Sequence, residues 1–490
     1  LRQQMHFTYI QDDFRMNDKL TLNLGMRYEY ATPQYETDNI MSNFDPATNT
    51  MILAKDGSLE DRALIKPDRN NFGPRLGFAY SVTPATVIRG GYGVSYIHFH
   101  RAGAANILSI NGPQVVNAVA TQTNPLAPAF RTTQQGYPAG FADPSAFNPV
   151  AANITYMPED YHSSRVQSYY ISVQREIARN MIVDVAYVGN RAEGLLLLAN
   201  FNQAAPNNVA GSIPLAARRP IPTFGDITYA FNGGKSRYNA LQIKYEYRLR
   251  DGIMLLNSFT WSKAKDNGSG TLENAPGNLP SPQDYHNLEA DFDTSGYDQP
   301  YNNTTSFVWD LPFGTGRRWM NTKNVVLNGI LGGWTVSGVN TMTSGEPATL
   351  NYTPGAAYLV SGINQDFRGA NNYRPNVIGD PYGDRNSTTN YLNRDTVVIP
   401  APTDPGQPFG NARRNSIRGP WFWQLDVVAA KHFMLPFGND PRLEIRIEAF
   451  NLLNRTNFRA PNINRSNANF GTITSAYDAR QLQLGVKLTF

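Results

Sequence analysis

Strict alternation of apolar and polar residues recurs along this sequence and limits its fold more than any other feature. It is clearest from Leu20 to Tyr30, from Leu241 to Leu249, from Leu443 to Ala449 and in the last ten residues, Gln481 to Phe490. A period of two residues predicts β-strands with one apolar and one polar face. Together with less regular segments, this pattern predicts strands near residues 5–14, 18–30, 72–82, 86–97, 165–177, 181–189, 241–250, 252–263, 303–311, 330–343, 421–433, 443–449 and 481–490.

The connections between these strands alternate between short and long. Tight hairpin turns are expected at Met16-Asn17-Asp18, Thr83-Pro84-Ala85, Ala178-Arg179-Asn180 and Asp251-Gly252. The long connections are rich in Pro, Gly, Asn, Ser and Thr and cover residues 31–71, 98–164, 190–240, 264–302, 344–420 and 450–480, while 312–329 is intermediate. Structureless connections of such length are uncommon in soluble domains.

Outer-membrane barrels sort their connections in this way, with short periplasmic turns at one rim and long extracellular loops at the other. A secreted β-sandwich or propeller also has amphipathic strands, but neither predicts this segregation of loop length. We therefore predict an all-β fold: an antiparallel, up-and-down transmembrane β-barrel in the outer membrane of a Gram-negative cell.

The composition excludes several other classes of protein. No apolar run approaches the ~18 residues of a membrane-spanning helix; the best candidates are short stretches such as GLLLLA, Gly194 to Ala199. Cysteine is absent, which excludes disulfide scaffolds and thiolate metal sites. The formal charge of +4 is spread along the chain without a nucleic-acid-binding motif, so we expect no nucleic-acid partner. Solvated loop charges explain the basic pairs Arg218-Arg219, Arg317-Arg318 and Arg413-Arg414.

In a membrane barrel the two faces of each strand meet lipid and lumen. A Lys or Arg at mid-depth on the lipid face would cost ~2–4 kcal/mol. We therefore assign these charged strand residues to the lumen: Arg27, Glu29, Lys244, Glu246, Arg248, Glu444, Arg446 and Glu448. Aromatic residues towards strand ends suit interfacial girdles, as at Tyr28, Tyr30, Tyr245, Tyr247, Phe259, Trp261, Trp421 and Trp423.

The number of strands predicts that the barrel is larger than this chain. With about thirteen strands, the first and the last run in the same direction, whereas single-chain bacterial barrels have even strand numbers. We therefore expect residues 1–490 to be the C-terminal part of a barrel whose first strands precede Leu1. The absence of an initiator Met and of a signal peptide agrees with a mature or truncated fragment.

Six segments resemble one family, the TonB-dependent outer-membrane transporters, and within it the Oar-like receptors that begin with a carboxypeptidase-regulatory-like domain. They are YIQDDFRMNDKLTLNLGMRYEY (Tyr9 to Tyr30), NFGPRLGFAYSVTPATVIRGGYGVSY (Asn71 to Tyr96), SRYNALQIKYEYRLRDGIMLLNSFTWSKAKDN (Ser236 to Asn267), FVWDLPFGTGRRW (Phe307 to Trp319), LEIRIEAFNLLNRTNFRAPN (Leu443 to Asn462) and FGTITSAYDARQLQLGVKLTF (Phe470 to Phe490). The long connections carry little of the resemblance.

The resemblance implies a twenty-two-stranded barrel filled by an N-terminal plug and energised through a TonB box by the inner-membrane TonB complex. Plug, TonB box and regulatory-like domain are not visible in residues 1–490. It also implies that a last strand ending in Phe is read by the barrel-assembly machinery. Physically, such a signal is an exposed strand edge able to pair with another sheet. The expected signal residues are Leu482, Leu484, Val486, Leu488 and Phe490.

Metal and catalytic motifs are weak. In DFDTSG, Asp291, Asp293, Ser295 and Gly296 match the start of a calcium loop, but Asn302 stands where a bidentate Glu is needed. His98 and His100 share a face of an expected strand without a third ligand. Gly91-Tyr92-Gly93 lacks the setting of a nucleotide loop, and no G-x-S-x-G elbow is present. We expect no cofactor, no resident metal and no enzyme activity.

These features favour a receptor barrel that takes up a scarce substrate through long extracellular loops and a charged lumen. Its expected partners are outer-membrane lipid, the barrel-assembly machinery, the TonB complex through an N-terminal region, and an unidentified extracellular ligand. Two alternatives stay open: a surface adhesin or export-linked scaffold, and a plugless diffusion porin. Loop composition favours no substrate among iron chelates, glycans and peptides.

Overall fold

The computed structural model describes residues 1–98, 108–114, 134, 136, 137, 140, 143, 145, 147–150, 152, 154–204, 215–248, 252–269, 282–321, 324–354, 373–402, 404, 408–435 and 441–489. Within these residues the secondary structure is mostly strand, as predicted. The helices in this part of the chain are all too short or too polar to cross a membrane.

One large antiparallel sheet forms the wall of the molecule. Its order follows the sequence: β1 (Met5–Arg15), β2 (Leu20–Ala31), β5 (Phe72–Thr83), β6 (Thr86–Ile97), β8 (Ser164–Ala178), β9 (Met181–Asn200), β10 (Ile227–Arg248), β11 (Ile253–Asp266), β13 (Tyr301–Asp310), β14 (Trp334–Thr343), β19 (Phe422–Met434), β20 (Arg442–Phe450) and β21 (Gln481–Thr489). The short β7 (Ile154–Tyr156) and β12 (Asp293–Thr294) attach to β10 and β11. The up-and-down antiparallel topology of the prediction is confirmed.

Three predicted boundaries were wrong. Strand β9 continues to Asn200 and β10 begins at Ile227, so the connection between them covers only residues 201–226. Leu197, Leu198 and Ala230 are fully buried in these extensions. Because packed loops cover both faces there, the sequence loses the alternation that marks the rest of the wall. The third error is the expected strand 330–343, which begins only at Trp334 after the helix α3 (Val325–Leu331).

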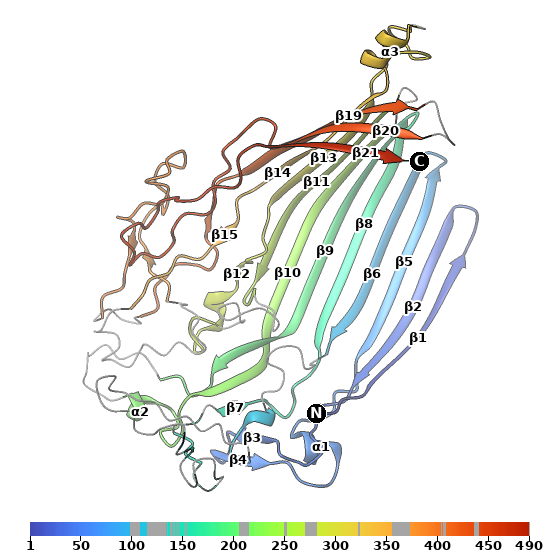
Figure 1. The fold of residues 1–490 in the computed structure, drawn as a ribbon. Coiled ribbons are helices and arrows are strands. Elements are labelled where there is room, and N and C mark those ends of the chain that lie inside the picture. Colours follow the sequence, from blue (N-terminus) through green and yellow to red (C-terminus); the bar gives the residue numbers. More distant parts are fainter. Residues whose placement is uncertain are drawn as a thin grey trace.

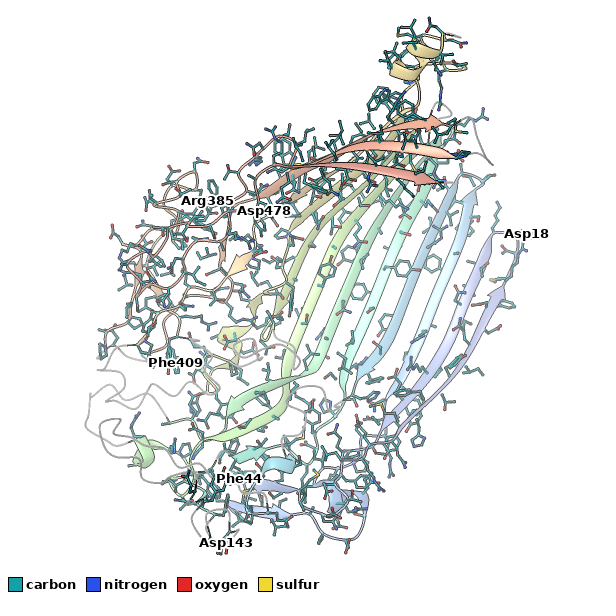
Figure 2. The ribbon with its side chains drawn as sticks, viewed as in Figure 1. Asp18, Phe44, Asp143, Arg385, Phe409 and Asp478 are labelled. Atoms are coloured by element: carbon teal, nitrogen blue, oxygen red, sulfur yellow. The ribbon has the colours of Figure 1, made fainter. Side chains whose placement is uncertain are left out.

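The two rims of the wall differ as predicted. The turns β1 to β2, β5 to β6 and β8 to β9 lie at one end with α3, and the long connections gather at the other end (Figure 1). Figure 2 places Asp18, in the turn between β1 and β2, far from Phe44, Asp143 and Phe409 in the long connections. The first and last strands run in the same direction, with the N-terminus at the long-loop rim and the C-terminus at the short-turn rim (Figure 1).

The described parts of the long connections have secondary structure of their own. They contain the small sheets β3 (Ser42–Asp45) with β4 (Thr50–Leu53), β15 (Pro347–Ala348) with β18 (Ile417–Arg418) and β16 (Asn376–Val377) with β17 (Val397–Val398), and the short helices α1 (Leu59–Ala63), α2 (Leu215–Arg218), η2 (Leu108–Ile110) and η5 (Leu288–Asp291). Apolar clusters bind these pieces together. One cluster joins Leu350, Leu392 and Ile417 to Phe470, so two separate connections share a core.

The wall itself keeps its apolar residues on the surface. Leu482, Leu484 and Val486 of β21 are 69%, 78% and 73% exposed, and Ile10 of β1 is 75% exposed. Soluble proteins rarely leave contiguous apolar patches this uncovered. An apolar wall between polar, packed loops is the arrangement that a bilayer requires.

Packing on the wall makes Gly189 a sensitive position. Gly189 of β9 lies opposite Tyr169 of β8, and a Cβ at Gly189 would stand 2.1 Å from Cε2 of the Tyr169 ring. The Tyr169 hydroxyl also contacts Oδ1 of Asn239 at 3.1 Å. We expect Gly189→Ala to push this ring from its rotamer and to lower barrel stability by about 0.5–1.5 kcal/mol, the cost of an off-rotamer side chain. Urea-induced unfolding in lipid vesicles measures the change; Gly93→Ala, also in a wall strand but with no heavy atom closer than 3.9 Å to its Cβ, is the control.

Candidate functional site

Charged side chains form two ladders on the wall. In β10, Glu246 pairs with Lys244 at 3.5 Å and with Arg248 at 2.6 Å. In β20, Arg446 pairs with Glu444 at 3.8 Å and with Glu448 at 3.1 Å. Successive charges two residues apart point to the same side of a strand, so each ladder can neutralise its own charges along the strand.

Strand register places both ladders, with Arg27 and Glu29, on one face of the sheet. Directly opposed residues share a face in an antiparallel pair. The pairing can be followed from Arg446 through Ala430, Thr335 and Asp310 to Gly252 next to β11. It continues through the pairs of β11 with β10, β10 with β9, β9 with β8, β8 with β6, β6 with β5 and β5 with β2. The charged face thus carries all eight residues predicted to face the lumen; that this face is the lumen stays a prediction.

A hollow of about 760 Å³ lies along this charged face, near the middle of the wall. Gly25, Gly77, Gly91 and Gly93 contribute no side chains to it. Arg75, Tyr170 and Asn190 line it with polar groups. The volume falls in the range of small-molecule sites, although the hollow is open to the surroundings. Gly91, doubtful as part of a nucleotide loop, therefore lies in a strand of the wall, as expected.

Ion pairs on four buried aspartates form a second cluster, at the long-loop rim, that we name the rim network. It joins Asp266, Asp291, Asp293 and Asp298 to Lys263, Arg374, Arg413, Arg414 and Arg418. Asp291 and Arg374 lie 2.6 Å apart with side chains 2% and 3% exposed. Gln283 contacts both partners. Its side-chain amide oxygen accepts from Nε of Arg374 at 2.9 Å, and its backbone N–H donates to the carboxylate of Asp291 at 2.8 Å.

The rim network connects segments that are far apart in sequence. Arg414 pairs with Asp266 at 2.6 Å and also donates to the carbonyl of Asp291 at 3.1 Å. Arg418 pairs with the fully buried Asp298. These contacts fix the connection between β14 and β19 against the end of β11 and the connection that follows it. Burial lowers the pKa of the Arg374 guanidinium, and the carboxylate of Asp291 opposes that effect.

The same contacts bear on the calcium hypothesis for Asp291 and Asp293. Arg374 and Arg413 each pair with one carboxylate oxygen of Asp291 and Asp293, and backbone N–H groups of Gln283 and Thr294 donate to the other oxygens. Ser295 donates to Asp266, and Asn302 lies in β13. Among the described residues, no group of three His, Asp or Glu side chains is placed to hold a metal. The arrangement is suited to anchoring loops rather than to binding a cation.

Sequence patterns missed most of the rim network. Reading Arg413-Arg414 as a solvated pair was right for Arg413, which is 76% exposed, and wrong for Arg414, which is 13% exposed. In the same way Arg219 is 10% exposed and pairs with Asp226 at 2.8 Å. Partners 120 to 148 residues apart leave no local signal, as for Asp298 with Arg418 and Asp266 with Arg414.

A third cluster surrounds Glu29 at the same rim. Its carboxylate pairs with Nε of Arg27 at 2.9 Å and with Nε2 of His98 at 2.9 Å, while Nδ1 of His98 meets the hydroxyl of Ser163 at 2.8 Å. Strand β6 ends at Ile97, so His98 lies beyond the strand on which it was expected; His100 lies outside the described residues. Both ring nitrogens of His98 are therefore engaged by protein groups.

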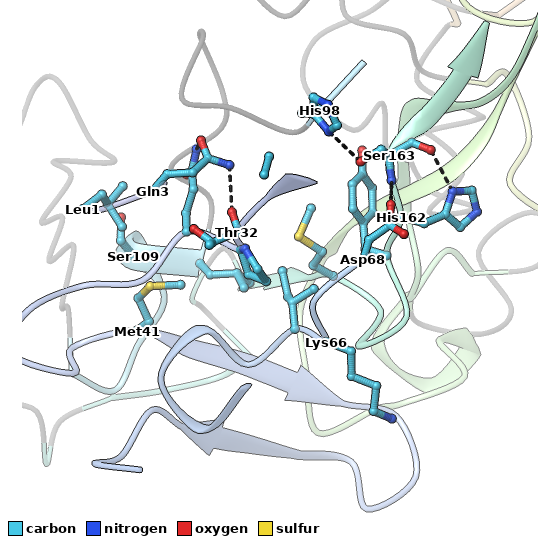
Figure 3. Close-up of a pocket in the computed structure, with 17 residues that line it drawn as sticks. Leu1, Gln3, Thr32, Met41, Lys66, Asp68, His98, Ser109, His162 and Ser163 are labelled. Atoms are coloured by element: carbon cyan, nitrogen blue, oxygen red, sulfur yellow. Dashed lines mark hydrogen bonds between the residues drawn. The ribbon is translucent and has the colours of Figure 1, made fainter. Parts of the chain in front are cut away.

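The cavity beside His98 is small (Figure 3). His98, Ser163 and Asp68 line one side, and Met41 and Ile65 are among its apolar residues. Its volume of about 50 Å³ has room for a few water molecules only. We therefore assign the Glu29 cluster to joining the loops after β2 and β6, not to substrate binding.

The predicted assembly signal lies at a sheet edge. Strand β21 pairs with β20, and in the sheet order β1 and β21 are the two outer strands. Leu482, Leu484, Val486 and Leu488 lie on the apolar face opposite Ala449, Ile447, Ile445 and Leu443. Phe490 lies outside the described residues. Recognition of these residues by the assembly machinery stays a prediction.

Comparison with known proteins agrees with this geometry. A family model described as an outer membrane beta barrel domain matches residues 1–483. The chain belongs to this family. Its localisation is accordingly the outer membrane, and its sheet is the wall of an outer-membrane barrel. A search of curated proteins finds no match.

Solved structures give more distant similarities. The outer membrane transporter YddB from Escherichia coli aligns with a TM-score of 0.49 at 13% identity, over 99% of this chain and 45% of that one. The pyoverdine receptor FpvA from Pseudomonas aeruginosa PAO1 gives 0.45 at 10%, over 100% and 42%. The FrpB iron transporter from Neisseria meningitidis gives 0.44 at 12%, over 99% and 45%. The chain thus spans less than half the length of each of these structures.

Proposed function

We propose that this outer-membrane barrel chain is part of a receptor for TonB-energised uptake of a scarce substrate. The observation that carries the proposal is the rim network, which fixes several long loops beside the charged face of the wall. A selective binding surface made from loops has to be preorganised, because ordering the loops on binding would cost affinity.

Two further observations support the proposal. The family match covers nearly all of the chain. The six segments quoted above resemble TonB-dependent transporters of the Oar-like group, whose plug and TonB box would lie N-terminal to residues 1–490 and contact the TonB complex. In this scheme residues 1–490 are the C-terminal part of the barrel. The wall holds no catalytic role, and the eight charged-face residues line the lumen.

The hollow on the charged face is the proposed route for the substrate. Arg75, Tyr170 and Asn190 offer one cation, one aromatic ring and one amide along it. Such groups hydrogen-bond small polar ligands and do not select a single substrate class. The lining residues therefore indicate a path for the ligand but not its chemical class.

Growth and uptake measurements test the proposal. Cells that lack this gene are expected to lose uptake of the substrate, and cells that lack the TonB complex should lose it equally although they still bind ligand at the surface. Matched cells that carry the intact gene and complex are the control. Binding without any energy-dependent accumulation would identify an adhesin or export-linked scaffold instead.

The porin alternative is tested by the gene itself and by conductance. A plug and a TonB box encoded upstream of Leu1 would exclude a plugless porin. A complete gene without them, together with a steady open-channel current for the purified protein in planar bilayers, would overturn the uptake proposal.

A further inference from the structure

Helix α3 exposes an unusual number of apolar side chains at the short-turn rim. Val325, Val326 and Ile330 are 84%, 69% and 61% exposed, and none of the seven helical residues is buried. Trp319 and Met320, just before the helix, are about half exposed. The helix projects beyond the ends of β13 and β14 (Figure 1). A helix of this length is not stable alone in water, so its apolar side chains need a partner.

The segment is nevertheless well fixed. The side chain of Asn324 accepts hydrogen bonds from the N–H groups of Val326 and Leu327 at 3.0 and 3.1 Å, which caps the helix. Oδ1 of Asn328 accepts from the N–H of Thr315 at 2.8 Å and ties the preceding loop to the helix. The apolar side chains are thus held outward by a defined structure, not by an unformed loop.

Helix α3 is attached to residues on the apolar face of the wall. The indole N–H of Trp334 donates to the carbonyl of Ile330 at 2.8 Å, and the ammonium of Lys431 donates to the carbonyl of Gly332. Trp334 lies opposite Lys431, which in turn lies opposite Ile445. Ile445 is the neighbour of Glu444 and Arg446 in β20 and so lies on the other face from the charged ladder.

Aromatic residues mark this part of the wall as a membrane boundary. Trp309 lies opposite Val336, two residues from Trp334, and so belongs to the same apolar face. The ammonium of Lys431 stands 5.6 Å from the Trp334 ring centre and 5.1 Å from that of Phe433. Trp and Lys at the ends of membrane strands are typical of the interface between lipid tails and headgroups.

Arginine residues precede the apolar cluster. Arg317 and Arg318 are exposed, and the guanidinium of Arg318 lies 5.7 Å from the Trp319 ring centre. Basic residues beside Trp and aliphatic side chains are the composition of helices that lie in a membrane surface. Their charge is complementary to the phosphates of anionic phospholipids.

We propose that residues 317–321 and 324–330 form a foot that lies in the surface of the leaflet at the short-turn rim, with Val325, Val326 and Ile330 buried at the boundary between headgroups and lipid tails and Arg317 and Arg318 on phospholipid phosphates. The foot extends the apolar face of the wall beyond the ends of its strands. This inference rests on the membrane wall and on its orientation, not on uptake.

Site-specific spin labels test the foot in the complete protein. The chain has no cysteine, so each single Cys variant carries one label. In phosphatidylglycerol-containing vesicles we expect a label at Val326→Cys to be reached by oxygen and shielded from a water-soluble nickel chelate, as a label at Leu484→Cys should be. A label at Asp18→Cys, in another turn of the same rim with a side chain 98% exposed, should respond to the nickel chelate.

Substitution of the two arginines tests the headgroup contact. The double substitution Arg317→Gln with Arg318→Gln should increase access of the nickel chelate to the Val326 label in phosphatidylglycerol vesicles. With both arginines present, access to the same label should also increase when phosphatidylcholine replaces phosphatidylglycerol. If neither the double substitution nor the change of lipid increased nickel access, the contact of Arg317 and Arg318 with anionic phospholipid would be overturned.

The outcomes separate the foot from the wall and from a protein partner. If the nickel chelate reached the Val326 label as it reaches the Asp18 label, while the Leu484 label stayed in lipid, the foot would be overturned. The uptake proposal would be unaffected. Water exposure at Leu484 as well would contradict the membrane wall. Water exposure in vesicles but protection in native outer membranes would assign the apolar cluster to a periplasmic protein, which also overturns the lipid proposal.

Discussion

Arg374→Met is expected to destabilise the loops that the rim network joins by about 3–5 kcal/mol, because it leaves the carboxylate of Asp291 buried without its cation. Asp291 is only 2% exposed, so its carboxylate cannot be solvated from the surface. The described part of the segment between 373 and 418 should then open at lower denaturant concentration. Protease cleavage within this segment, measured on protein folded in vesicles against urea concentration, reports the opening.

Two control variants show whether the missing charge is the cause. Arg374→Met combined with Asp291→Leu removes both charges, and we expect it to recover much of the lost stability, because an apolar pair avoids the cost of desolvation. Arg413→Gln breaks the pair between Arg413, 76% exposed, and Asp293, 12% exposed, whose N–O distance is 3.2 Å. It should cost only about 1 kcal/mol, because water reaches the guanidinium side of this pair. If Arg374→Met were as mild as Arg413→Gln, the rim network would not be what holds the loops.

The wall could be predicted closely from the sequence because its strands meet lipid on one face. Lipid excludes charge so strongly that alternation survives along β2, β10, β20 and β21. The same rule put Glu246 and Glu448 on one face, although β11, β13, β14 and β19 separate their strands. Where packed loops replace lipid, as around Leu197 and Leu198, alternation stops and the prediction of the strand ended eleven residues early, at 189 instead of Asn200.

The loop structure could not be predicted in the same way. Asp291 and Arg374 are 83 residues apart, and neither is marked by its neighbours in the sequence. Their pairing depends on how two long connections pack, which no local period encodes. The helix α3 was missed for a different reason: Val325 and Val326 are β-branched and favour strands, and only the cap at Asn324 and the glycines Gly332 and Gly333 define a short helix.

Leu484→Lys is expected to impair folding into bilayers, with a cost of about 2–4 kcal/mol for a lysine at mid-depth on the lipid face. Leu484 is 78% exposed and lies opposite Ile447 on the apolar face of the wall. Ile445→Lys, opposite Val486 on the same face, should behave alike. The folded fraction in vesicles, read from the heat-modifiable shift in gel mobility, measures the loss.

Glu448→Leu and Glu246→Leu are the matched controls on the charged face. Glu448 lies opposite Gln483, one residue away from Leu484 in β21, so depth and strand are nearly the same while the face is opposite. Loss of one carboxylate leaves Arg446 with its second partner, Glu444, at 3.8 Å. We expect both variants to fold into vesicles as the unmodified chain does. Equal losses for Leu484→Lys and Glu448→Leu would show that the two faces do not meet different surroundings, and the assignment of the charged face to the lumen would then fail.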